Sequence, residues 1–283
     1  MERLSAAVAR AGLAAEVIFS AAAQVRQNAE HALRKALARQ IDAIVVGGGD
    51  GTVGTVARVV AGAGVPLGIV PLGTLHHFAK DLGPPLDIDG AVQVIAAART
   101  RDVAVAEVNG RVFVNNASIG IHPCMVVDRD RRRSTAGLSK GLAMSLAFLR
   151  MLWRFPRRRL SIRTEGWTAP RRTPCLLIGN NEHGIELLTL GRRNRLDAGE
   201  LWLIVATPRN SRALRWFAVR AAFGGLNPGE DFATLRAKAV EIRMRASRMH
   251  VALDGEVVTM RPPLNYRVRS GALRVFAPAP PEE

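Results

Sequence analysis

The chain has 283 residues, 48% of them hydrophobic, and its 40 Lys and Arg residues against 24 Asp and Glu residues give a formal net charge of +16. This length allows one large or two medium domains with a substantial core, and the composition excludes an intrinsically disordered chain. The two cysteines, Cys124 and Cys175, lie far apart, which argues against a disulfide framework or a zinc site and fits a reducing cytoplasm. The basic excess favours anionic partners.

The first hundred residues predict strands that alternate with helices. Two short apolar segments, 43–46 and 67–70, are typical of buried strands, and each is followed by a loop that contains glycine. Further elements are expected as a strand at Glu16–Ser20, a helix at 24–39 with an apolar stripe that includes Leu37, and a helix at 89–98 capped by Asp89. This alternation predicts a parallel sheet covered by helices on both faces.

Ligands bind such sheets at the carboxyl ends of the strands, where loops 47–52 and 71–74 are expected as neighbours. The segment 42–55 has the sequence DAIVVGGGDGTVGT, which predicts a strand, a glycine turn and the start of a helix. Glycines allow close approach of a ligand, and the first N–H groups of a helix suit a phosphate. Asp50 would repel a phosphate unless a cation bridges them or the carboxylate handles a proton. The alternative is a tight turn in an ordinary α/β protein.

The rest of the chain predicts a second, mainly antiparallel domain. A hairpin is expected at Asn109-Gly110, because this dipeptide favours the tight turn of a hairpin. Helices are expected at 134–153 and 210–223. Strands are expected at 160–164, 175–179, 201–206, 240–244, 249–253, 257–260, 266–268 and 273–276. We place the domain boundary near residue 101, which gives domains 1–101 and 102–283 and an active site in the cleft between them.

Several motifs together resemble a known family. They are GGGDGT, PLGT followed by HFAKDLG, VNNASIG, RLDAGEL and LDGE, in that order along the chain. This order is similar to that of the diacylglycerol kinase catalytic-domain family, which includes bacterial lipid kinases and the sphingosine and ceramide kinases, with NAD kinases as distant relatives. The resemblance implies an α/β nucleotide-binding domain, a β-sandwich-like C-terminal domain, and phosphorylation of a lipid hydroxyl that depends on ATP and Mg²⁺.

The resemblance also implies roles for individual residues. Asp50 would orient Mg²⁺ or the acceptor hydroxyl, and Asp254 or Glu256 would be the general base. Asp197 would be a second Mg²⁺ ligand, although Ala198 stands where the family usually has the metal carboxylate. The ATP phosphates would be cradled by Gly48, Gly49, Gly51, Thr52 and Thr74.

The sequence leaves three hypotheses open. The first is a cytoplasmic lipid kinase, peripheral at an anionic inner-membrane surface, with arginine clusters at 129–133 and 154–159 beside a helix that contacts lipid or packs in the core. The second is a kinase for a soluble hydroxyl substrate. The third is a non-catalytic relative, since the family's first strand is expected to be missing and His76 replaces its usual Asn. No nucleic-acid partner is expected, because no recognition motif is present, and a homodimer is left open.

Overall fold

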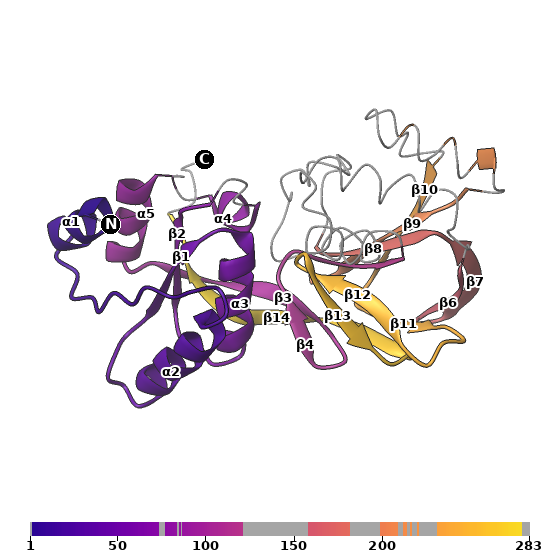
Figure 1. Cartoon of the computed structure of the whole chain (residues 1–283), viewed down its shortest axis with the longest axis horizontal. Coiled ribbons are helices and arrows are strands. Elements are labelled where there is room, and N and C mark those ends of the chain that lie inside the picture. The colour runs from indigo at the N-terminus through magenta and orange to yellow at the C-terminus, as the bar shows by residue number, and fades with distance from the viewer. Residues whose placement is uncertain are drawn as a thin grey trace, which may run out of the picture. The chain divides into compact units, whose positions relative to one another are not determined.

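The computed structural model describes residues 2–73, 77–83, 85, 87–120, 158–181, 199–208, 212, 213, 216, 220 and 231–278. Contacts divide the chain into two compact units (Figure 1). The first contains Met1–Asn115, Arg192–Gly199 and Val268–Glu283, and the second contains Asn116–Gly191 and Glu200–Arg267. The first unit thus extends beyond the expected boundary at residue 101, because a hairpin that follows this boundary and the end of the chain both belong to it.

The first unit is an α/β structure. Its sheet has the strand order β1–β2–β14–β3–β4, in which β1 and β2 are parallel and β3 and β4 form an antiparallel hairpin. The sheet is therefore mixed rather than purely parallel. The strands are β1 (Ile44–Gly48), β2 (Leu67–Pro71), β3 (Thr100–Val108), β4 (Arg111–Phe113) and the later residues of β14 (Leu264–Phe276). The helices are α1 (Glu2–Arg10), α2 (Val25–Leu37), α3 (Asp50–Val60), α4 (His77–Leu82) and α5 (Ile88–Ala96).

Helices cover β2 on both faces, as predicted. Leu67 and Ile69 are buried in a core that they share with residues of α2 and α3. Gly68 has the opposite orientation, and a Cβ atom at this position would lie 2.9 Å from the side chain of Ile95 in α5. The predicted apolar stripe of α2 is only partly correct, because Leu37 at the end of the helix is 62% exposed.

Two local predictions in this unit were wrong. Residues Glu16–Ser20 form no strand, and Val17, Ile18 and Phe19 are exposed. In the described part of the chain β1 is the edge of the sheet and pairs only with β2, and Glu16–Ser20 adds no further strand beside it. A strand is stable only beside a partner, so a short apolar stretch alone was not sufficient to form one.

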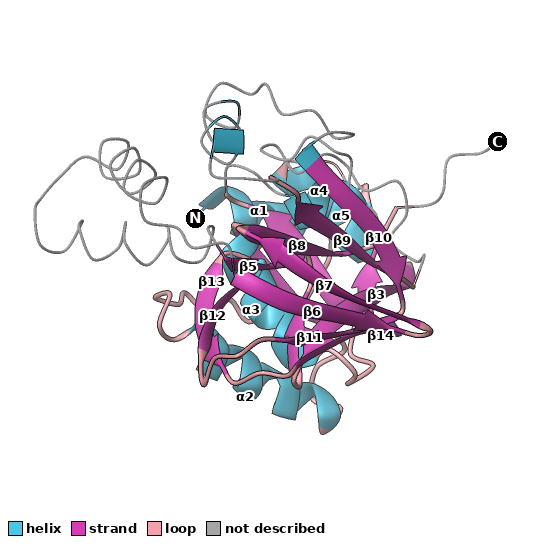
Figure 2. Cartoon of the chain, turned by 90° about the vertical axis from the view of Figure 1, so that its right-hand side faces the viewer, coloured by secondary structure: helices cyan, strands magenta, loops and turns pink. Residues whose placement is uncertain are grey.

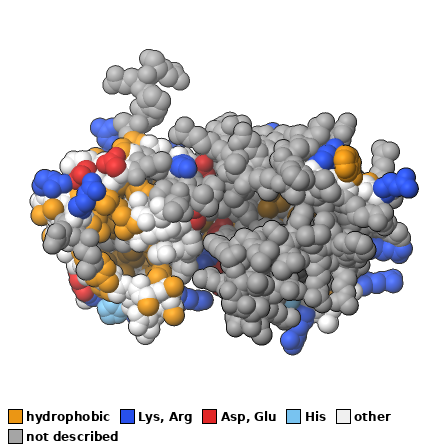
Figure 3. All heavy atoms as spheres, turned by 45° about the horizontal axis from the view of Figure 1, so that its top comes forward, with side chains coloured by type: hydrophobic (Ala, Val, Ile, Leu, Met, Phe, Trp, Pro, Cys, Tyr) orange, Lys and Arg blue, Asp and Glu red, His pale blue; other side chains and the backbone are white. Residues whose placement is uncertain are grey.

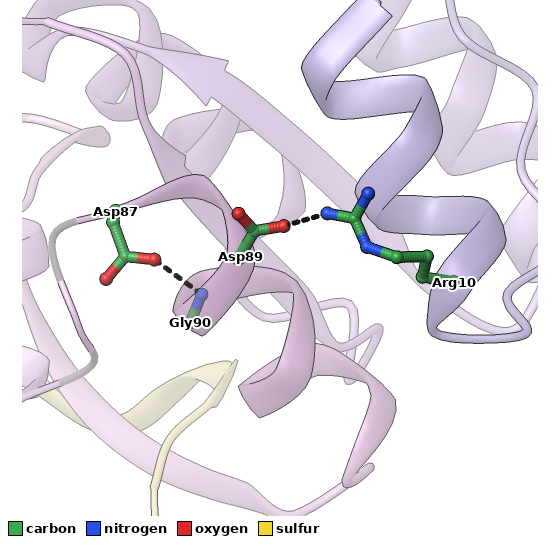
Figure 4. A network of polar contacts seen from close by, with 4 residues as sticks. All are labelled: Arg10, Asp87, Asp89 and Gly90. Carbon is green, nitrogen blue, oxygen red and sulfur yellow. Dashed lines mark hydrogen bonds and ion pairs between the residues drawn. The ribbon is translucent and has the colours of Figure 1, made fainter.

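The cap of α5 was the second error (Figure 4). The side chain of Asp87, not Asp89, accepts a hydrogen bond of 2.8 Å from the backbone N–H of Gly90. Asp89 lies inside the first turn and forms an ion pair with Arg10 of α1. The helix therefore begins one residue earlier than predicted, and Asp89 links two helices instead.

The second unit consists of antiparallel strands, which confirms the predicted class (Figure 2). One sheet has the order β10–β9–β8–β5–β12–β13, and the other strands of the unit follow the order β14–β11–β6–β7. The bounds are β5 (Asn116–Gly120), β6 (Arg158–Thr164), β7 (Trp167–Thr173), β8 (Cys175–Asn180), β9 (Leu201–Ala206), β10 (Phe232–Ala237), β11 (Ala239–Arg243), β12 (Met249–Leu253) and β13 (Glu256–Met260).

Sequence patterns missed three features of these strands. β7 and β10 were not predicted, because neither segment shows a clear apolar alternation. The segments 266–268 and 273–276 belong to the single strand β14, since Ser270-Gly271 continues the strand instead of ending it. The predicted helix 134–153 lies outside the described residues, and from 210–223 only Arg212, Ala213, Trp216 and Arg220 are described, all as helix.

No helix in the described ranges combines the length and the apolar character needed to cross a membrane.

Candidate functional site

The glycine turn after β1 joins the end of a strand to the start of a helix. β1 ends at Gly48, Gly49 is the N-cap residue, and α3 begins at Asp50. The backbone N–H groups of Thr52 and Val53 both donate to the carbonyl oxygen of Gly49 at 3.0 Å. The N–H of Thr52 is therefore used within the turn, and the group that this residue offers to a ligand is its hydroxyl.

The turn is tightly packed on one side and open on the other. A Cβ atom at Gly48 would lie 2.8 Å from Cβ of Thr52, and one at Gly47 would lie 2.9 Å from Cδ1 of Leu72. At Gly51 an added Cβ would meet nothing within 4 Å, and this residue is exposed. The glycines thus have different tasks, because Gly48 permits close packing of the helix on the strand end, whereas Gly51 leaves space in front of the first helical turn.

The loop after β2 lies beside this turn, as predicted. Gly48 and Pro71 are paired in the parallel register, and the N–H of Leu72 donates to the carbonyl oxygen of Gly48 at 3.3 Å. One carboxylate oxygen of Asp50 accepts a long hydrogen bond of 3.4 Å from the N–H of Phe78 in α4. The segment after β2 therefore contacts the glycine turn twice, through its loop at Gly48 and through α4 at Asp50. Thr74, the second hydroxyl that the sequence predicts here, lies outside the described residues.

This arrangement is suited to a phosphate that binds together with a cation. The N–H groups at the start of a helix lack partners within it, and the helix dipole adds partial positive charge. The half-buried carboxylate of Asp50 lies in the same first turn of α3. A phosphate bound there would need a cation beside this carboxylate, since two negative charges at short distance repel each other.

In the second unit, Asp254 and Gly255 form the two-residue turn between β12 and β13. Their φ angles of +48° and +85° fit a type I′ hairpin turn, and Leu253 pairs with Glu256 across it. The N–H of Asn116 donates to a carboxylate oxygen of Asp254 at 3.2 Å, and the N–H of Asp254 donates to the carbonyl oxygen of Asn116 at 2.9 Å. The carboxylate is thereby held at the start of β5. Glu256 is exposed.

A buried amide pair close to this strand end was not found by sequence reasoning. Asn180 and Asn181 follow the apolar part of β8 and are both 0% exposed. Asn181 has a φ of +66°, and its N–H donates to the carbonyl oxygen of Glu200 at 3.0 Å. The pair lies beside the start of β5, because Asn116 is paired with Gly179 in the register. Two consecutive asparagines directly after an apolar strand were the signal in the sequence.

No cluster of three or more His, Cys, Asp or Glu side chains with the spacing of a metal site occurs among the residues that the structure describes. Asp197, the predicted second metal ligand, lies outside this part of the chain. The roles of the site residues therefore remain predictions, although the geometry brings Gly48, Gly49, Asp50, Gly51 and Thr52 together in one turn.

The sequence of this chain is similar to the sequences of known lipid kinases. The profile of the diacylglycerol kinase catalytic domain matches residues 2–108. A protein of Pseudomonas aeruginosa named a probable lipid kinase, YegS-like, is 31% identical over 261 residues, which cover 89% of this chain and 82% of that protein.

Solved structures show the same fold at lower identity. The crystal structure of a putative diacylglycerol kinase from Bacillus anthracis has a TM-score of 0.73 and 22% identity, and covers 98% of this chain and 91% of that one. Yeast NADH kinase in complex with NADH has a TM-score of 0.52 and 13% identity, and covers 84% of this chain and 62% of that one. These two likenesses concern the fold alone.

The packing of the turn predicts that replacing glycine with alanine has different effects on stability at Gly48 and at Gly51. Gly48→Ala is expected to lower the free energy of unfolding by about 1–3 kcal/mol, because the new methyl group overlaps the side chain of Thr52. Gly51→Ala adds the same methyl group in open space near the start of a helix, and is expected to leave stability unchanged or raise it by up to about 1 kcal/mol. Urea unfolding measures both. Equal destabilisation by the two variants would contradict the packing described here.

Proposed function

The chain belongs to the diacylglycerol kinase catalytic-domain family, and from this membership we propose that it transfers the γ-phosphate of ATP to a hydroxyl of diacylglycerol or a related lipid. The observation that carries the proposal is the position of Asp50, a carboxylate in a glycine turn at the start of α3, where it accepts a hydrogen bond from α4. Phosphoryl transfer needs positioned phosphates, neutralised charge and an oriented acceptor hydroxyl, and this turn offers groups for the first two.

The turn fits the phosphates of a nucleotide. Nothing lies within 4 Å of the side-chain position at Gly51, so a phosphate oxygen has room to approach the first turn of α3. Backbone groups of Gly48, Gly49 and Gly51 and the hydroxyl of Thr52 would hold these oxygens, together with Thr74. ATP supplies the phosphoryl group that is transferred.

Mg²⁺ is the cation that we propose beside Asp50. In nucleotide sites this ion usually binds one or two carboxylates and completes its shell with phosphate oxygens and water, so a three-ligand protein cluster is not required. Asp50 would provide one carboxylate, and Asp197 is proposed as a second. The cation offsets the repulsion between Asp50 and the phosphates.

Asp254 and Glu256 are the proposed acceptors of the proton from the lipid hydroxyl. A general base has to be held in a defined position, and the hydrogen bond from the N–H of Asn116 does this for Asp254. Glu256 is two residues away on an exposed strand end. A lipid acceptor also implies contact with a membrane surface, which we propose as the partner of this protein.

Asp50→Asn is expected to lower kcat by about 10²-fold or more while the fold is retained, because the amide oxygen still accepts from Phe78 but carries no charge. The assay uses labelled ATP, Mg²⁺ and a mixed lipid extract, and counts label in the organic phase. Asp42→Asn is the matched control, since Asp42 is an exposed acid just before β1.

The distribution of label decides between the hypotheses. Label in the organic phase that is lost with Asp50→Asn and kept with Asp42→Asn supports the lipid kinase. Label only in an aqueous product would point to a soluble substrate, and ATP binding without any transfer would point to a non-catalytic relative. Full activity of Asp50→Asn would remove this residue from the proposed mechanism.

Two further variants, each of which replaces a carboxylate with an uncharged amide, identify the general base. Asp254→Asn preserves the hairpin, because Asn-Gly is as favourable in a type I′ turn as Asp-Gly, so any loss of turnover reports the missing charge. Glu256→Gln is the corresponding change at the neighbouring acid. We expect one of the two to lower kcat by about 10²-fold at unchanged thermal stability. Wild-type turnover in both variants would show that the base lies elsewhere.

A further inference from the structure

One surface of the second unit collects exposed arginines on three neighbouring strands. In β6 the buried Leu160 and Ile162 alternate with the exposed Arg159 and Arg163. The same alternation continues in β11 and in the first residues of β14, where the exposed Arg243 and Arg267 each follow a buried residue. We call the surface formed by Arg159, Arg163, Arg243 and Arg267 the β6–β11 face.

The strand register places these side chains on one side of the sheet. Glu241 lies opposite Arg163 and Asn265, Arg243 lies opposite Ser161, and Ala239 lies opposite Arg267. Residues directly opposite each other in antiparallel strands point to the same face, and three adjacent strands span only about 10 Å. Figure 2 shows β6, β7 and β11 side by side, and Figure 3 shows Lys and Arg side chains among the coloured atoms at its right-hand edge.

The carboxylate of Glu241, which lies on this face, is paired with an arginine. Both carboxylate oxygens of Glu241 accept hydrogen bonds from Arg243, at 2.7 and 3.1 Å. The bond with Arg243 lowers the pKa of Glu241, and the positive charge of Arg163 adds to the effect. Because Glu241 is paired with Arg243, the exposed Arg159 and Arg163 leave the face with an excess of positive charge.

We propose that the β6–β11 face binds an anionic lipid membrane. The choice of a membrane rests on the proposed function, because a lipid kinase must meet its substrate at a bilayer. The exposed residues of the described face agree with it, since they are arginines and small polar or apolar residues without an aromatic side chain on which a nucleic-acid base would stack. Headgroup phosphates pair well with guanidinium groups.

Arg159→Gln/Arg163→Gln tests the proposal by vesicle sedimentation. Each basic residue near an anionic surface contributes about fivefold to binding, so the double variant is expected to lose about 25-fold in partition to mixed phosphatidylcholine–phosphatidylglycerol vesicles. The wild-type protein should bind these vesicles more weakly as salt is raised, and should not bind vesicles of phosphatidylcholine alone. Circular dichroism checks that both proteins are folded.

The matched control is Arg99→Gln/Arg101→Gln, which removes two exposed arginines at the start of β3 in the first unit. It should bind within about twofold of the wild type, since these arginines lie outside the face. Equal losses in the two double variants would overturn the proposal and assign the binding to net charge. Wild-type protein that binds a DNA duplex but no anionic vesicles would also overturn it.

Vesicle binding is measured without turnover, so its result is independent of the kinase assay. Lipid phosphorylation in neutral detergent micelles should be the same for Arg159→Gln/Arg163→Gln and the wild type. Absent phosphorylation with intact vesicle binding would contradict only the proposed function, whereas intact phosphorylation with no vesicle binding would contradict only the proposed face.

Discussion

The missing side chain at Gly48 is the constraint on which the rest of the site depends. A Cβ atom there would overlap the side chain of Thr52, so any larger residue would force α3 away from the end of β1. With glycine, the first turn of the helix lies directly on the strand end, and the loop after β2 is tied to the same point through the hydrogen bond from Leu72. The carboxylate of Asp50 is thus placed by backbone packing.

Features with a local cause were predictable from the sequence. The glycine turn follows from residue types that lie next to each other, and so does the hairpin turn at Asn109-Gly110, where both residues have positive φ angles. The parallel pairing of β1 and β2, which brings the two loops together, followed from the alternation of strands and helices. For this reason the position of the two loops beside each other was predicted, whereas the roles of the residues around Asp50 stay predictions.

Features that depend on distant parts of the chain were not predictable in this way. Glu16–Ser20 has the pattern of a strand but no described strand beside it, and Asp89 forms an ion pair with Arg10, 79 positions away, while Asp87 caps the helix. The burial of Asn180 and Asn181 depends on strands that meet only in the folded chain. Local patterns also could not show that the second unit would gather arginines from β6, β11 and β14 on one face.

The proposed function requires that the turn around Asp50 holds the phosphates of ATP. Hydrogen–deuterium exchange of the full chain, with and without a non-hydrolysable ATP analogue and Mg²⁺, tests this claim most directly. We expect slower exchange in peptides that cover residues 47–53 when the analogue is present, and a loss of this protection in Asp50→Asn. Unchanged exchange of these peptides at saturating analogue would contradict the account.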